Sequence, residues 1–240
     1  MVAGPLVREV IYTRANAREP AKVRQAKRKT SSEAQQRMNA RNSWEKLELM
    51  LAANFTTGDL FATLTFDDQH LPATRTAAAA RLKQFRKDFT LLRAAKHEDA
   101  RMIWTLENAH DGRWHVHIVV NATGDDFSDI LRCWPYGSDV EIRKIQVDRE
   151  KNYESLARYM CKEMRERPGL RSWSYTRNCQ HPEIETFAVP DDTVLKVPED
   201  ATVLSEEQKR TEYAEFHYIK YLSKSLRQLR SPRRRARRKR

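Results

Sequence analysis

The chain has 240 residues, of which 40% are hydrophobic and 32% are charged, and its formal net charge is +12. This length suits one medium domain with extensions, and the hydrophobic content is sufficient for a buried core. The chain start lacks the apolar run of a secretory signal, and no stretch approaches membrane-spanning length, which predicts a cytoplasmic protein without membrane contact. The three cysteines include no C-x-x-C pair, so neither a zinc knuckle nor a disulfide framework is indicated.

The positive charge is concentrated at the two ends of the chain. Residues 1–44 carry a net charge of +7 and residues 222–240 carry +10, whereas residues 45–221 carry −5. Basic ends attract the phosphates of any nucleic acid by counterion release, without reading its sequence. The distribution favours a nucleic-acid-binding protein, although solvated charge would explain either end alone.

The hydrophobic periodicity predicts alternating helices and strands between residues 30 and 180. The predicted helices cover residues 30–55, 76–92, 125–134 and 149–167, and the predicted strands cover residues 60–66, 101–107, 114–121 and 140–147. Strands linked by a hairpin, with helices between them, predict an α+β domain in which helices cover one face of a central antiparallel β-sheet.

The regions outside this domain are less regular. Residues 1–29 are basic without clear periodicity and are expected to form a flexible arm. Residues 186–197 are irregular or form a hairpin, whereas residues 213–226 have helical periodicity. The predicted organisation is therefore an arm (1–29), a domain (30–180), a partly helical extension (181–230) and an arginine-rich tail (231–240).

A histidine pair, His115 and His117, lies in one predicted strand. Residues two apart in a strand project from the same face, with Cα atoms about 6.6 Å apart. The Asp111-Gly112 turn signal folds the preceding strand back and brings Glu107 near both histidines. Two imidazoles and a carboxylate suit a divalent metal, Mn²⁺ or Mg²⁺, acting on a phosphate, and the same set can also hold zinc. The alternative is a pair of hydrogen-bonded surface histidines.

Tyr159 and Lys162 lie three residues apart in the predicted helix 149–167 and therefore on one face of it. A tyrosine in a helix is usually a packing residue, and this spacing is common by chance. Tyr153, six residues before Tyr159, does not share its helix face.

The order, spacing and structural setting of three motifs resemble the HUH endonucleases, and among them the single-tyrosine rolling-circle replication initiators of phages, plasmids and small circular DNA viruses. Residues Phe61–Phe66 resemble the first motif strand, Arg113–Ile118 the histidine–apolar–histidine strand, and Tyr159–Lys162 the tyrosine–lysine motif. The Trp-Pro-x-Gly turn at Trp134–Gly137 follows the second motif, as in bacterial and phage-type initiators. The resemblance covers roughly residues 30–180 and implies an RRM-like, ferredoxin-like sheet.

This resemblance implies a metal-dependent reaction on single-stranded DNA at a replication origin. A metal held by His115, His117 and Glu107 would polarise the scissile phosphate, and Tyr159 would attack it to form a 5′-phosphotyrosine. Lys162 would favour the phenolate or position the phosphate. No G-x-x-x-x-G-K-[ST] loop occurs in the sequence, so a separate helicase, together with a polymerase, is the expected partner.

Further DNA contacts are predicted outside the catalytic motifs. They involve Arg113, the aromatic–basic cluster Trp173, Tyr175, Arg177 and Asn178, and the tail residues Arg233, Arg234 and Arg235. Packing of the aromatic cluster on a helix is the alternative. Two other functions also stay open: a relaxase or single-strand transposase with the same chemistry, and a non-catalytic nucleic-acid-binding protein with structural histidines.

Overall fold

The computed structural model describes residues 1–12, 33–109, 112–148, 152–162, 172–190, 192–210 and 215–224. The chain divides into two compact units, one of residues 31–180 and the other of residues 1–30 and 181–240. Within the described residues the fold is α+β, with two antiparallel sheets and four helices, as predicted. None of the described helices is both long and apolar enough to cross a membrane. The predicted arginine-rich tail lies outside the described residues.

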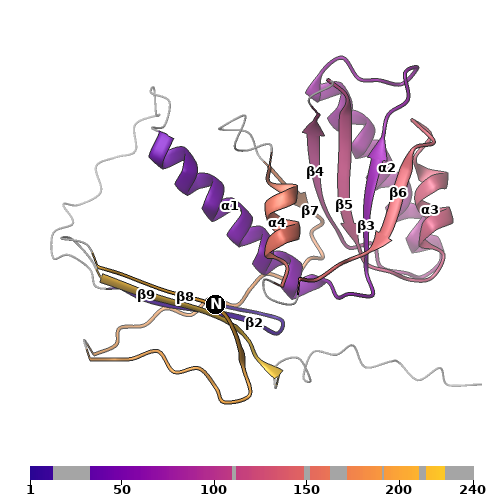
Figure 1. Ribbon diagram of the computed structural model, residues 1–240. Coiled ribbons are helices and arrows are strands. Elements are labelled where there is room, and N and C mark those ends of the chain that lie inside the picture. The colour runs from indigo at the N-terminus through magenta and orange to yellow at the C-terminus, as the bar shows by residue number, and fades with distance from the viewer. Residues whose placement is uncertain are drawn as a thin grey trace, which may run out of the picture. The chain divides into compact units, whose positions relative to one another are not determined.

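A five-stranded antiparallel sheet forms the centre of the unit 31–180 (Figure 1). Its strands, in spatial order, are β6 (Val140–Lys144), β3 (Leu60–Thr65), β5 (Trp114–Val120), β4 (Met102–Asn108) and β7 (Ser174–Tyr175). The four longer strands lie where the sequence predicted them, although β6 ends three residues earlier than expected. The short strand β7 was not predicted as a strand, and it pairs with β4.

One face of this sheet carries the hydrophobic core. Alternate residues of the strands, among them Leu64, Val116 and Ile118, are fully buried on that face. Two helices, α2 (Arg75–Ala95) and α3 (Asp126–Cys133), contribute apolar side chains to the same cluster. The positions that helical periodicity predicted for α2, such as Phe85 and Phe89, are fully buried.

The opposite face of the sheet is met by the short helix α4 (Glu154–Met160), whose Tyr159 ring contacts Phe61 and His117. Helices therefore lie on both faces of the sheet, which corrects the prediction of helices on one face. The helix α4 is shorter than the predicted 149–167 because residues 161 and 162 form a turn, while residues 149–151 and 163–167 lie outside the described residues.

The longest helix, α1 (Glu33–Asn54), holds α4. The Arg158 guanidinium carbon lies 3.9 Å from the centroid of the Trp44 ring. Tyr153, which precedes α4, is buried, and its hydroxyl donates a hydrogen bond of 2.6 Å to the carbonyl oxygen of Phe55. Cation–π and hydrogen-bond contacts thus fix α4 relative to the C-terminal part of α1.

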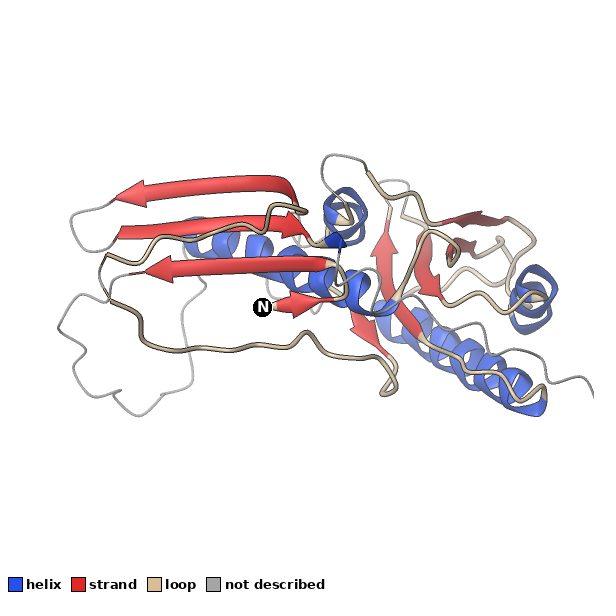
Figure 2. Cartoon of the chain, turned by 90° about the horizontal axis from the view of Figure 1, so that it is seen from below, coloured by secondary structure: helices blue, strands red, loops and turns tan. Residues whose placement is uncertain are grey.

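The second unit contains a four-stranded antiparallel sheet (Figure 2). Its strands, in spatial order, are β1 (Val2–Ala3), β2 (Leu6–Tyr12), β9 (Glu215–Leu222) and β8 (Thr202–Arg210). The strand β2 lies within the predicted flexible arm, and β9 replaces a predicted helix. Both segments are rich in β-branched and aromatic residues, and pairing buries Val7, Ile219 and Tyr221 on one face. The described residues of 186–197 form neither helix nor strand, which fits the irregular alternative.

A buried ion pair joins α2 to α3. The Arg93 side chain, fully buried in α2, pairs with Asp126 in the first turn of α3. Asp126 also accepts hydrogen bonds of 3.0 Å from the backbone N–H groups of Thr123 and Gly124. Burial acts to raise the pKa of the Asp126 carboxyl, but these hydrogen bonds and the Arg93 charge outweigh it and lower the pKa.

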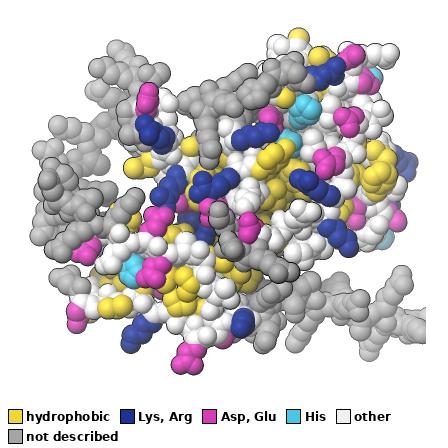
Figure 3. Space-filling model, in the orientation of Figure 1, with side chains coloured by type: hydrophobic (Ala, Val, Ile, Leu, Met, Phe, Trp, Pro, Cys, Tyr) yellow, Lys and Arg dark blue, Asp and Glu magenta, His cyan; other side chains and the backbone are white. Residues whose placement is uncertain are grey.

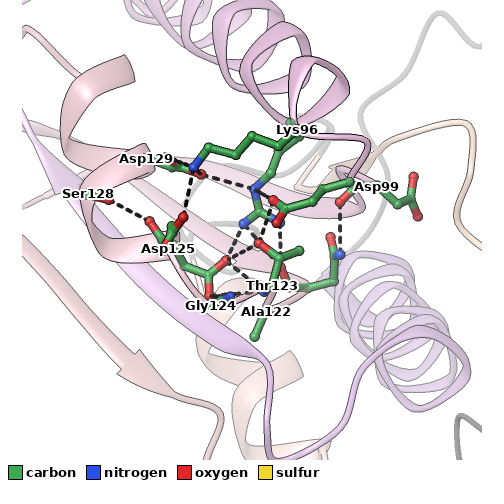
Figure 4. A network of polar contacts seen from close by, with 12 residues as sticks. Lys96, Asp99, Ala122, Thr123, Gly124, Asp125, Ser128 and Asp129 are labelled. Atoms are coloured by element: carbon green, nitrogen blue, oxygen red, sulfur yellow. Dashed lines mark hydrogen bonds and ion pairs between the residues drawn. The ribbon is translucent and has the colours of Figure 1, made fainter. Parts of the chain in front are cut away.

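A more exposed part of the same network surrounds this pair (Figure 4). Lys96 reaches Asp129 at 2.7 Å and Asp125 at 3.3 Å. Because the Asp125 side chain is largely exposed, its ion pair is weakened by solvent, unlike the pair made by Asp126.

We expect Asp126→Asn to lower the free energy of unfolding of this unit by about 3 kcal/mol, because it leaves the Arg93 charge buried without its closest counter-charge. Urea denaturation followed by circular dichroism measures the change. Asp125→Asn is the matched control and should stay within about 0.5 kcal/mol of the wild type. Equal stability of the two variants would contradict a structural role for the buried pair.

Candidate active site

Two threonines of β3 hold the histidine pair of β5. The register places Thr63 opposite His117 and Thr65 opposite His115. Thr63 Oγ1 lies 3.1 Å from His117 Nδ1, and Thr65 Oγ1 lies 3.2 Å from His115 Nδ1. A hydroxyl both donates and accepts, so each threonine can satisfy Nδ1 in either tautomer of its histidine. Nε2 is then the nitrogen through which each ring can bind a further group.

Glu107 of β4 is paired in register with His115, as the hairpin prediction required. Its Oε2 lies 2.7 Å from His117 Nε2, and its Oε1 lies 2.8 Å from Lys162 Nζ. Burial acts to raise the pKa of the Glu107 carboxyl, but the hydrogen bonds and charges of His117 and Lys162 outweigh it and lower the pKa to about 2. Glu107 is therefore ionised at neutral pH.

Tyr159 reaches the same cluster from α4. Its side chain is 39% exposed, and its ring meets the His117 ring edge-on, with centroids 5.1 Å apart. Lys162 Nζ lies 4.4 Å from the centroid of the Tyr159 ring. Burial acts to lower the pKa of the Lys162 ammonium, but hydrogen bonding to Glu107 and the proximity of Tyr159 raise it overall. The phenol, ammonium, imidazole and carboxylate thus meet on one face of the sheet.

Phe61 belongs to this cluster although the sequence analysis did not assign it a role. Its buried ring is nearly parallel to that of His117, with centroids 5.8 Å apart, and it meets the Tyr159 ring edge-on at 6.0 Å. The alternation of β3 was the available signal, since Phe61, Thr63 and Thr65 occupy every second position and share the histidine face.

The side chains of the described residues do not meet as a ready-made metal centre, since no group of three His, Cys, Asp or Glu among them has suitable positions. Glu107 is turned toward His117 and Lys162, and His115 is held by Thr65. The residue types nevertheless fit a divalent ion, because two imidazoles bonded at Nδ1 and an ionised carboxylate share one sheet face. The face shown in Figure 3 carries histidine side chains beside lysine or arginine side chains.

The predicted DNA-binding residues have varied positions. Arg113, next to β5, donates to the Phe66 carbonyl at 3.3 Å and forms an ion pair with Asp68. Trp173 donates from Nε1 to the Ser43 carbonyl of α1 at 3.2 Å, and its ring lies 5.8 Å from that of Tyr175. This is the packing contact that the alternative expected, and DNA contact by the cluster remains a prediction.

Arg177 is exposed, and Asn178 donates to the Asp99 carboxylate at 2.6 Å and thus faces the start of β4. The sequence proximity of this segment to Tyr159 therefore gives it no role in the chemistry. The tail residues Arg233, Arg234 and Arg235 lie outside the described residues.

One family model matches the central part of the chain. Residues 59–166 match a model of replication-associated proteins of the ORF2 type, a range that spans less than half of the 240 residues. The range begins just before β3 and extends past Lys162, so it includes all three motifs. The match supports a role in DNA replication. No curated protein and no solved structure matches the chain.

The Trp134–Gly137 turn supports the end of β3 next to the site. Trp134 Nε1 donates to the Thr65 carbonyl at 3.1 Å, and the Asp67 N–H donates to the Tyr136 carbonyl at 2.9 Å. A Cβ added at Gly137 would overlap the Thr65 carbonyl oxygen and lie 2.9 Å from the Asp67 nitrogen. Only glycine lets the turn approach the β3 backbone this closely.

We expect Gly137→Ala to lower the free energy of unfolding by about 1–3 kcal/mol, because the turn must move away from Thr65. Gly58→Ala is the matched control, since its added Cβ would meet Thr56 Oγ1 at an ordinary 3.6 Å. Chemical denaturation of both variants measures the difference. A Gly137→Ala protein as stable as Gly58→Ala would show that the turn tolerates displacement.

Proposed function

We propose that the protein initiates rolling-circle replication by nicking and rejoining single-stranded origin DNA, with Tyr159 as the nucleophile. The observation that carries the proposal is the position of the Tyr159 ring, 5.1 Å from the His117 ring and beside the Lys162 ammonium. A phenol next to an imidazole–carboxylate pair has the components of phosphodiester transfer. The replication-associated family match favours an initiator over a relaxase or a transposase.

The proposed reaction exchanges one phosphodiester for another. The Tyr159 oxygen attacks phosphorus and gives up its proton, while the bond from phosphorus to the 3′ oxygen breaks and that oxygen takes a proton. The products are a 5′-phosphotyrosine and a free 3′-hydroxyl. Because the phosphodiester energy is retained, the reverse step needs no ATP, and the 3′-hydroxyl can prime a polymerase. Unwinding of the duplex is assigned to a separate helicase.

The residues around Tyr159 have distinct proposed roles. The Lys162 ammonium stabilises negative charge on the phenol oxygen or on the phosphate, and Glu107 orients it through the 2.8 Å ion pair. His115, His117 and Glu107 are the proposed ligands of Mn²⁺ or Mg²⁺, which would polarise the scissile phosphate when bound. Thr63 and Thr65 orient the two rings through Nδ1.

Replacement of the nucleophile should abolish covalent capture of DNA. We expect Tyr159→Phe to give no adduct with a single-stranded origin oligonucleotide in Mn²⁺, whereas Tyr153→Phe should still form one, because the Tyr153 hydroxyl is buried against Phe55. Denaturing gels and mass spectrometry of the trapped peptide–oligonucleotide detect the adduct. An adduct that persists in Tyr159→Phe but is lost in Tyr153→Phe would assign the nucleophile to Tyr153.

Loss of a proposed metal ligand should separate cleavage from binding. We expect His115→Ala to lose cleavage by a factor of about 100 or more while keeping DNA affinity, because the basic ends bind phosphates without the metal. His217→Ala, which alters a histidine of the other unit, is the control and should cleave normally. Equal loss of cleavage and binding in His115→Ala would contradict this division of roles.

A further inference from the structure

An arginine on the edge strand of the five-stranded sheet faces the candidate site. Arg143 of β6 is paired in register with Phe61, so both side chains project from the face that carries the histidines. The Arg143 guanidinium carbon lies 5.2 Å from the centroid of the Phe61 ring, and half of the side chain is exposed. Arg143 therefore combines a fixed position with access to a ligand.

Phe61 links this arginine to the proposed nucleophile. Its ring centroid is 5.2 Å from the Arg143 guanidinium carbon and 6.0 Å from the Tyr159 ring centroid, so these two groups are at most about 11 Å apart. A few nucleotides of a DNA strand span such a distance. Lys162 contacts Glu107 on β4, whereas Arg143 lies on β6, two strands beyond the histidine strand. The two cations thus flank Tyr159 on different strands of the sheet.

The resting partner of Arg143 is a weakly held carboxylate. Arg143 Nη1 lies 3.3 Å from Glu141 Oε1, and both side chains are half exposed or more. An exposed ion pair of this kind contributes little to stability. A phosphate offers the guanidinium two parallel hydrogen bonds and a larger charge, so it can replace Glu141. Glu141, opposite Thr63 on the same face, would in turn repel a phosphate placed there.

We propose that Arg143 is a positioning residue that binds a backbone phosphate of the single strand, within a few nucleotides of the bond that Tyr159 cleaves. The inference deepens the proposed function and rests on it for the identity of the strand. The competing explanation is structural: Arg143 covers the Phe61 ring by a cation–π contact and binds nothing. The two explanations differ in salt dependence and in the effect of neutral phosphates.

The first test measures binding of a single-stranded origin oligonucleotide by the full chain carrying Tyr159→Phe, so that cleavage plays no part. We expect Arg143→Gln to weaken binding about 5-fold and to reduce the slope of log affinity against log salt by about 0.7, the value of one phosphate contact on single-stranded DNA. Arg143→Lys should retain the slope. Lys144→Gln makes the same charge change on the opposite face of β6 and should alter both quantities less than Arg143→Gln.

The second test locates the contact. Oligonucleotides with one neutral methylphosphonate at successive positions should bind more weakly at one position near the cleavage site, and this position should lose its effect in Arg143→Gln. Glu141→Gln should change affinity in the opposite direction, with binding about 2-fold tighter, because a repelling carboxylate is removed. Identical interference profiles in the wild-type and Arg143→Gln backgrounds would overturn the proposal.

The outcomes separate this inference from the proposed function. A shifted salt slope and an altered interference profile would support the Arg143 contact even if the unmodified chain forms no covalent adduct. An adduct on Tyr159 with a profile that Arg143→Gln leaves unchanged would support the nicking reaction and assign Arg143 to the structural role.

Discussion

The register of three neighbouring strands holds the candidate site together. Backbone pairing of β3, β5 and β4 sets Thr63 opposite His117 and Glu107 opposite His115. A slip of one residue would move these side chains to the core face and expose the apolar ones. The core residues on the other face, such as Val116, are fully buried, so hydrophobic burial fixes the register. The energy that stabilises the fold therefore also determines which polar groups meet.

Glu107 connects the two halves of the site electrostatically. One carboxylate oxygen contacts the His117 ring and the other contacts the Lys162 ammonium. A partly buried carboxylate needs such partners, since desolvation alone would favour its neutral form. Because Lys162 also lies over the Tyr159 ring, the neighbour of the proposed nucleophile and a proposed metal ligand share one carboxylate. Changes at either group are thereby transmitted to the other.

The sequence predicted the parts of this structure that depend on local pattern. The strand alternation and the hairpin turn signal were enough to bring Glu107 to His115, because both follow from nearby residues. The pairing of β2 with β9 was not predictable in this way, since it joins residues 6–12 to residues 216–222. The Lys162–Glu107 contact likewise depends on how α4 lies against the sheet, which the spacing of Tyr159 and Lys162 does not specify.

The proposed nucleophile and the proposed ligands are anchored by different elements. The histidines and Glu107 belong to the sheet, whereas α4 is fixed to α1 through the Tyr153 hydroxyl and the Arg158–Trp44 contact. Tyr159 meets the sheet through ring contacts with Phe61 and His117, which constrain direction less strictly than hydrogen bonds do. The phenol oxygen can therefore adjust by rotation of one partly exposed side chain, while the sheet keeps the imidazoles and the carboxylate in register. This arrangement suits a reaction in which the same oxygen must both attack a phosphate and later be displaced from it.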